Sequence, residues 1–285
     1  MPPLPLSYIT VTDVSRLAPH MIRVSFIGDG LTTLGSTEPD RQVKLYFPRA
    51  GQDRPTLPDP NTDFMSWYQA YGALPEERRP VARSYTIAAH HPAGSSVDID
   101  FVLHPDAGPA TRWAAGAKQG DVLAMFGPSA DFARRVPLST STKAADWVLI
   151  VGDDTALPAI AAILAALPEG TPARVYAEVG APEDELPLGL AETTTVHWIH
   201  RDGAAPGNGP LVDIVRAAEF PRGTPFAWIA GEAGQVRALR RHLVDERGVD
   251  RRSIDFTGHW RLDLSQDDAP TTEDLAEARE RLADA

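Results

Sequence analysis

Apolar and polar residues alternate in several short segments of the N-terminal half, a pattern typical of half-buried antiparallel strands. Residues 8–14 and 21–27 form two β-rich runs, and residues 43–48 form a third. A longer run at 97–104 places Asp98 and Asp100 between apolar neighbours. Several short strands joined by turns predict an antiparallel barrel, which we expect over residues 6–135.

The pattern changes from Trp147 onward. Residues 148–151 form a continuous apolar run, as expected for a buried parallel strand, and residues 156–167 form a helix rich in Ala and Leu. Further strands are expected at 173–179, 195–200, 226–230 and 254–256, and further helices at 211–218 and 235–247. Alternating strands and helices predict a doubly wound α/β domain.

These patterns predict three parts of the chain: a barrel domain (1–138), an α/β domain (139–262) and an acidic helical tail (263–285). The run 139–143 looks like the linker between the first two. The tail has two interpretations, a solvated helix docked by a narrow apolar stripe or a segment that binds a partner or forms a dimer.

The segment 49–80 is rich in Pro and charge and also has two interpretations. It carries an aromatic patch whose spacing permits a short helix: Phe64, Trp67, Tyr68 and Tyr71. The patch either packs aromatic rings onto the barrel or forms a lid over a bound cofactor.

Composition excludes several classes of function. The formal net charge of −12 argues against binding to nucleic acid, whose partners concentrate positive charge. Without cysteine, the chain has no disulfide, thiolate nucleophile or Cys-ligated iron–sulfur cluster. The eight histidines are scattered, so we expect no metal site made by the protein itself. No secretory signal or apolar run of about 20 residues is visible, so we expect a cytoplasmic protein without stable membrane insertion.

The chemistry-bearing residues gather in the stretch 83–132. The guanidinium of Arg83 matches phosphate oxygens, although a surface ion pair is the alternative, and Tyr85 lies on the same side of the strand. The turn at 108–111 leads into a short helix whose N-terminus offers backbone N–H groups, with Trp113 packed beneath it. A fixed cation, a helix N-terminus and a flat aromatic ring are the parts that a flavin requires.

Four linked segments of this stretch resemble the siderophore-interacting protein family, the ferric-siderophore reductases of the ferredoxin-reductase-like superfamily. They are RSYTIA (83–88), DFVLH (100–104), GPATRWA (108–114) and GDVLAMFGP (120–128). The likeness runs from about Leu6 to Arg261. It implies a six-stranded-type antiparallel flavin-binding barrel followed by a doubly wound α/β domain, with FAD as the cofactor.

The resemblance assigns roles to residues. Arg83 binds phosphate, Tyr85 lies against the isoalloxazine and Thr86 reaches its N5 edge. The expected cofactor-binding residues are Arg83, Ser84, Tyr85, Thr86, Val102, Leu103, His104, Gly108, Pro109, Ala110, Thr111, Asp153, Thr155 and Trp260. His104 and Trp260 have structural alternatives, a satisfied histidine and the cover of a neighbouring loop. The expected substrate-binding residues are Lys44, Arg135 and Arg261, and Lys44 is expected to be at least half-buried in its apolar run.

The loop Gly152-Asp153-Asp154-Thr155 departs from ordinary reductases, in which a Gly-rich loop cradles a pyridine nucleotide. Two carboxylates here repel phosphate, so we expect poor affinity for NADH and NADPH. Asp153 and Thr155 remain candidates for the adenine end of FAD or for capping the helix. Arg201 is either a contact for nucleotide phosphate or a surface residue. His259 departs from the Tyr of the family's GYWR motif.

These features predict an FAD-dependent ferric-siderophore reductase. Reduced flavin passes one electron to chelated Fe(III), and the Fe(II) is released; no acid–base residue is expected. The electron donor is NAD(P)H or ferredoxin. Two alternatives stay open: a general NAD(P)H:flavin or ferredoxin reductase, and a non-catalytic flavin-containing protein that binds siderophores.

Overall fold

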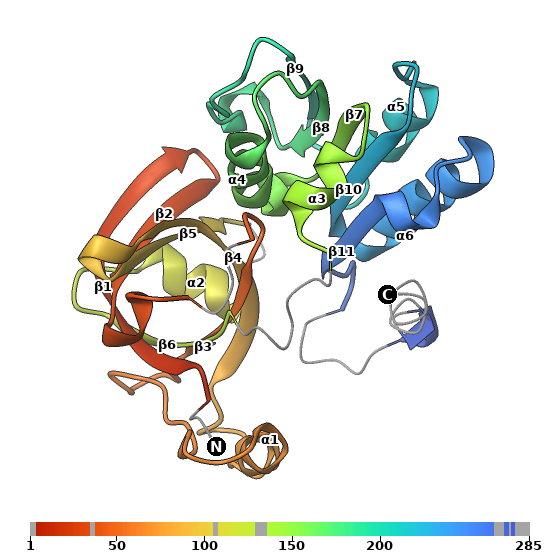
Figure 1. Cartoon of the computed structure of the whole chain (residues 1–285). Coiled ribbons are helices and arrows are strands. Elements are labelled where there is room, and N and C mark those ends of the chain that lie inside the picture. Colours follow the sequence, from red (N-terminus) through yellow and green to blue (C-terminus); the bar gives the residue numbers. More distant parts are fainter. Residues whose placement is uncertain are drawn as a thin grey trace. The chain divides into compact units, whose positions relative to one another are not determined.

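The computed structural model divides the chain into two compact units, residues 1–133 and 134–285 (Figure 1). It describes residues 4–34, 38–104, 108–128, 136–264, 271–273 and 275–276. Most of the acidic tail predicted at 263–285 lies outside these residues. No helix within the described part of the chain is long and apolar enough to cross a membrane.

The first unit is a closed six-stranded barrel with antiparallel pairing, as predicted. Its strands are β1 (Leu6–Ala18), β2 (Met21–Ile27), β3 (Gln42–Phe47), β4 (Val81–His91), β5 (Ser96–Val102) and β6 (Val122–Phe126). They close in the order β1-β2-β5-β4-β3-β6. Alternation along each strand sends one set of side chains inward, and these fill the barrel with a continuous apolar core.

Helix α2 (Pro109–Ala115) packs into this core and lies within the ring of strands in Figure 1. Its Trp113 stacks on Phe26, with ring centroids 6.3 Å apart, and meets Phe47 and Phe101 at 5.5 and 5.9 Å. This agrees with the expectation that Trp113 packs beneath the turn at 108–111.

Helix α1 (Phe64–Gly72) covers the outside of the barrel. Its Trp67 is 1% exposed and contacts Tyr46 of β3 and Phe126 of β6. Asp63 caps the helix by accepting a hydrogen bond from the backbone N–H of Ser66 at 2.9 Å. The segment therefore packs aromatic rings onto the barrel, which is the first of its two interpretations.

The second unit is a parallel five-stranded sheet with helices, as predicted for a doubly wound domain. Its strands are β7 (Trp147–Gly152), β8 (Ala173–Val179), β9 (Thr194–His200), β10 (Pro225–Glu232) and β11 (Ile254–Trp260). Its helices are α3 (Leu138–Lys143), α4 (Leu157–Ala166), α5 (Leu211–Ala217) and α6 (Ala233–Arg241), the last continued by a π-helical turn at His242–Glu246. Short 3-10 turns are Asp29–Leu31, Pro92–Gly94, Asp154–Ala156, Pro182–Asp184 and Arg251–Ser253.

The prediction of a linker at 139–143 is wrong. These residues form most of α3, and Leu138 and Thr142 are buried. Ser and Thr suggest a loop because they compete with helical hydrogen bonds, but burial of one face of this helix outweighs that preference.

The strand order β11-β10-β7-β8-β9 places a topological switch point between β7 and β10. From β7 the chain builds outward through β8 and β9, then returns to add β10 and β11 on the other side. Open α/β sheets bind ligands at the carboxyl ends of the strands at such a point. The residues after β7 and at the end of β10 therefore decide what this unit can bind.

Candidate functional site

The predicted flavin motif lies on β4, next to β3. Arg83 pairs with Leu45 and Tyr85 pairs with Val43, and both partners belong to the buried core. Because side chains alternate along a strand, Arg83 and Tyr85 point to the inner face of the sheet. Arg83 is half-buried, and its Nη1 donates to the carbonyl oxygen of Ala82 at 2.7 Å.

Two aromatic rings connect this motif to α2. The ring of Tyr85 lies 4.5 Å from that of Phe101 and 6.3 Å from that of Phe47, and Trp113 contacts the same two rings. The structure thus brings together two predicted segments that are separate in the sequence. Burial raises the pKa of the Tyr85 phenol above its ordinary value of 10.0.

The N-terminus of α2 follows the predicted turn. Gly108 is extended, Pro109 occupies the first helical position, and no side chain caps this end among the described residues. Ala110 is buried and Thr111 is half-buried, and both belong to the first turn of α2, where backbone N–H groups have no partner within the helix. This donor set suits phosphate oxygens.

The other predicted barrel residues lie along β4 and the end of β5. Val102 ends β5, and the N–H of Leu103 donates to the carbonyl oxygen of His20 at 2.8 Å, which extends the pairing by one residue. His104 is half-buried. On β4, Thr86 is buried and Ser84 is exposed. Their predicted contacts with the cofactor stay predictions.

The expectation that Lys44 is at least half-buried is wrong. Its neighbours Val43 and Leu45 fill the barrel, so alternation turns Lys44 outward, where it is exposed between its strand partners Ser84 and Phe126. The predicted role of Lys44 in binding substrate stays a prediction. Of the two other expected substrate residues, Arg261 is half-buried and Arg135 lies outside the described residues.

In the second unit, the carboxylate of Asp153 ties three strand ends together. One oxygen accepts from the backbone N–H of Glu232 at 2.9 Å and from the indole Nε1 of Trp260 at 2.8 Å. The other accepts from the N–H of Thr155 at 2.9 Å and from its hydroxyl at 2.5 Å. Burial raises the pKa of Asp153, and the hydrogen bonds from Thr155 and Trp260 oppose that rise.

Both oxygens of Asp153 therefore have partners within the chain. The predicted contacts of Asp153 and Thr155 with the adenine end of FAD stay predictions, while the capping alternative describes the observed geometry. Trp260 also lies against Gly207, where an added Cβ would come within 3.1 Å of the indole. This contact agrees with the alternative interpretation of Trp260, in which its ring covers a neighbouring loop.

Glu232 is a residue that the sequence interpretation missed. It is buried at the N-terminus of α6, where one oxygen accepts from the N–H of Gln235 at 2.8 Å. The other accepts from the N–H of Leu262 at 3.1 Å. An acidic residue directly before the amphipathic helix Ala233–Arg241 was an available signal for a helix N-terminus.

Arg201 is not a surface residue, which corrects one of its two interpretations. Its side chain is 8% exposed, and Nη2 donates to Asp154 at 2.7 Å. Its Nη1 lies 3.6 Å from an oxygen of Glu178, which is fully buried. Burial lowers the pKa of Arg201, but the carboxylates outweigh this and raise it overall, whereas burial raises the pKa of Glu178.

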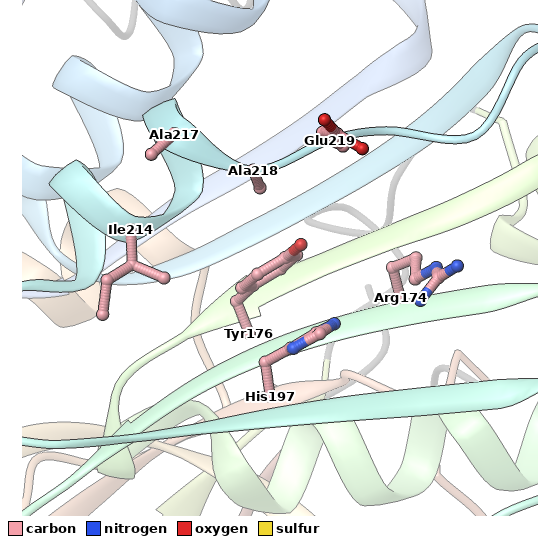
Figure 2. A pocket seen from close by; sticks show the side chains of 7 residues that line it. All are labelled: Arg174, Tyr176, His197, Ile214, Ala217, Ala218 and Glu219. Atoms are coloured by element: carbon pink, nitrogen blue, oxygen red, sulfur yellow. The ribbon is translucent and has the colours of Figure 1, made fainter.

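A pocket of about 430 Å³ opens on the sheet face beside α5 (Figure 2). In Figure 2 the rings of Tyr176 and His197 lie parallel on neighbouring strands, with centroids 4.6 Å apart and planes inclined by 10°. The remaining lining residues are Arg174, Ile214, Ala217, Ala218 and Glu219. None of the predicted site residues lines this pocket.

Comparison with known proteins matches both units. The model of the "Siderophore-interacting FAD-binding domain" covers residues 10–132, and that of the "Siderophore-interacting protein" covers residues 145–263. The crystal structure of a siderophore utilization protein from T. fusca is 33% identical with a TM-score of 0.79, covering 94% of this chain and 97% of that one. Ferric vibriobactin reductase of Vibrio cholerae is 28% identical, over 85% of this chain and 84% of its own.

A more distant structure shows the fold alone. The ferredoxin reductase of carbazole 1,9a-dioxygenase is 20% identical with a TM-score of 0.61, covering 90% of this chain and 69% of that one. The architecture is thus ferredoxin-reductase-like. The match over the barrel identifies FAD as the cofactor, and the guanidinium of Arg83, the ring of Tyr85 and the first turn of α2 provide groups that fit it.

Proposed function

This chain belongs to the siderophore-interacting protein family, and we propose that it is an FAD-dependent ferric-siderophore reductase. The reaction passes one electron to Fe(III) held in an organic chelator. One observation carries the proposal. Tyr85 of the RSYT strand and Trp113 of α2 both contact the rings of Phe47 and Phe101. When bound, FAD supplies the redox-active ring that carries the electron.

The barrel residues bind and orient the cofactor in this proposal. The guanidinium of Arg83 and the first turn of α2, including Thr111, hold the pyrophosphate through charge-assisted hydrogen bonds. Tyr85 presents a flat ring whose position is set by Phe101 and Phe47. Ser84 and Thr86 provide hydrogen-bonding groups for the polar edge of the isoalloxazine ring.

The other expected cofactor residues extend this surface. Val102, Leu103 and His104 place backbone groups beside the ring and its ribityl chain. Gly108 precedes α2, and Pro109, Ala110 and Thr111 begin its first turn. In the second unit, Asp153, Thr155 and Trp260 remain candidates for the adenine end.

Release of iron follows from the chemistry of the substrate. Hard oxygen ligands such as catecholate or hydroxamate hold Fe(III) strongly and the less highly charged Fe(II) far more weakly. Many ferric chelates are anionic, so exposed cations are needed on a chain whose net charge is −12. Lys44 is the first candidate because it is exposed and pairs with Ser84 of the flavin motif, and Arg135 and Arg261 are the others.

The test is rapid anaerobic mixing of chemically reduced holoprotein with ferric catecholate and ferric hydroxamate chelates, with an Fe(II)-specific dye as the trap. We expect flavin absorbance to return as the dye signal appears, at one Fe(II) per electron. Tight binding without electron transfer would identify a non-catalytic siderophore-binding protein. Equal rates with unrelated acceptors such as ferricyanide and no preference for ferric chelates would favour a general reductase.

A further inference from the structure

The fold leads one to expect a pyridine nucleotide at the carboxyl ends of β7 and β10. Such a ligand needs two things there: free N–H groups at a helix N-terminus for its phosphates, and a glycine-rich loop that lets its pyrophosphate approach the backbone.

Carboxylates of the chain itself already occupy the donors. Asp153 accepts from the N–H groups of Thr155 and Glu232. Glu232 in turn accepts from the N–H of Gln235 in the first turn of α6. The helical segments that follow β7 and β10 therefore each begin beside a buried carboxylate of the chain. A bound phosphate would have to accept hydrogen bonds from the same N–H groups.

Glycine packing shows that these carboxylates are built into the fold. Gly231 has a φ of +139°, and a Cβ there would lie 2.7 Å from an oxygen of Asp153. A Cβ on Gly234 would lie 2.8 Å from an oxygen of Glu232. Glycine at these two positions makes room for the chain's own carboxylates instead of a ligand.

The loop between β9 and α5 adds a second layer. Gly207 packs against Trp260 and Glu232, and its carbonyl oxygen accepts from Nε2 of Gln235 at 3.2 Å. Further along, the N–H of Leu211 donates to Glu178 at 3.1 Å. This loop rests on the same groups that a nucleotide at this edge would have to contact.

The guanidinium of Arg201, which is buried at this edge, already has carboxylate neighbours. Arg201 pairs with Asp154 and lies beside Glu178, so its charge is balanced within the unit. A phosphate would have to displace at least one of these carboxylates, and breaking a buried ion pair leaves an uncompensated charge.

From these contacts we propose that Asp153 and Glu232 determine donor specificity by occupying the phosphate positions of the nucleotide crevice, so that this unit does not bind NADH or NADPH there. The cause is occupation and not simple repulsion, because Asp154 is neutralised by Arg201 and Asp153 is hydrogen-bonded on both oxygens. The inference rests on the proposed function only in one respect, namely the reaction for which a donor would supply electrons. Nucleotide binding is a separate property of the chain.

The first test is calorimetric titration of the full-length FAD-loaded protein with NADH, NADPH and 2′,5′-ADP. We expect no saturable binding below about 1 mM, which corresponds to a binding free energy weaker than about −4 kcal/mol. Saturation in the micromolar range by any of the three would overturn the proposal. Reduction of ferric chelate by chemically reduced protein, measured in parallel, reports on the proposed function independently of this result.

The second test uses Asp153→Gly, which removes the internal anion, with Asp146→Gly as the matched control. Asp146 also accepts from a backbone N–H, that of Thr224, but at the opposite edge of the sheet. We expect inorganic phosphate to raise the melting temperature of Asp153→Gly by about 2–4 °C more than that of wild type or the control. An equal rise in all three proteins would contradict internal occupation. If Asp153→Gly does not fold, the titration of the wild-type protein decides the question.

Discussion

The carboxylate of Asp153 accepts a hydrogen bond from the indole of Trp260 at 2.8 Å, across 107 positions of the sequence. Asp153 follows β7 and Trp260 ends β11, and β10 lies between these two strands. Because Asp153 also binds the N–H of Glu232 at the end of β10, one side chain joins three strand ends. These hydrogen bonds link the carboxyl ends of β7, β10 and β11.

This geometry predicts a loss of stability in Asp153→Asn. An amide has one acceptor oxygen, so at least one buried donor loses its partner, and the free energy of unfolding should fall by about 1–3 kcal/mol. Urea unfolding followed by tryptophan fluorescence measures the change. FAD affinity of the same variant tests the predicted adenine contact, since an unchanged affinity would limit Asp153 to its structural role. A change in stability below about 0.5 kcal/mol would contradict the buried network.

Arg83→Ala should lose most of its FAD and remain folded. Removing one charge-assisted hydrogen-bonding group costs about 1.5–3 kcal/mol, or roughly ten- to a hundred-fold in affinity. Fluorescence titration of the apoprotein with FAD gives the dissociation constant. Arg16→Ala is the matched control, because Arg16 is exposed on β1 and donates to Pro19. Equal affinity of Arg83→Ala and wild type would make Arg83 a structural residue.

Lys44→Glu should weaken binding of an anionic ferric chelate without loss of FAD. The change replaces an exposed cation with an anion beside Ser84, and each exposed charge interaction contributes up to about 1 kcal/mol. The expected loss of affinity is therefore several-fold, and added salt should reduce it. Lys118→Glu, an exposed lysine of the same unit, is the control. Identical behaviour of the two variants would show that the effect comes from net charge alone.

Glu178→Gln should change how stability depends on pH. Burial raises the pKa of Glu178 above its ordinary value of 4.5, so the folded chain holds this proton more tightly than the unfolded chain. The stability from this group is complete below the unfolded pKa and is lost as pH rises through the folded pKa. The unfolding free energy of wild type minus that of Glu178→Gln should therefore fall as pH rises above the ordinary value of 4.5. A difference that stays constant from pH 4 to 7 would count against a raised pKa.

Trp67→Ala should destabilise the barrel unit strongly. The indole is almost fully buried between Tyr46 and Phe126, and removing such a side chain costs about 3–5 kcal/mol. Tyr68→Ala on the exposed side of α1 should change stability by less than about 0.5 kcal/mol. Thermal unfolding of both variants measures the difference. Similar small effects would indicate that α1 is a mobile lid and not a docked helix.

Local patterns were sufficient to predict most of the secondary structure. Alternation along β2 and the unbroken apolar run of β7 depend on neighbours a few residues apart, so they are visible in a single sequence. The same is true of the RSYT strand and the turn before α2, because the chemistry of each lies within four consecutive residues. These patterns predicted an antiparallel barrel and a doubly wound α/β domain, and the structure confirms both architectures.

The contacts that decide the carboxyl edge of the sheet lie far apart in the sequence. Asp153 meets Glu232 across 79 positions, and Arg201 meets Asp154 across 47. A local motif shows two carboxylates in a loop but not the donors that approach them, so it could not predict the hydrogen bonds that Asp153 and Asp154 accept. The outward direction of Lys44 likewise follows from the pairing of β3 with β4 and β6. Strand pairing and burial fix these directions because they act between segments that meet only after the chain has folded.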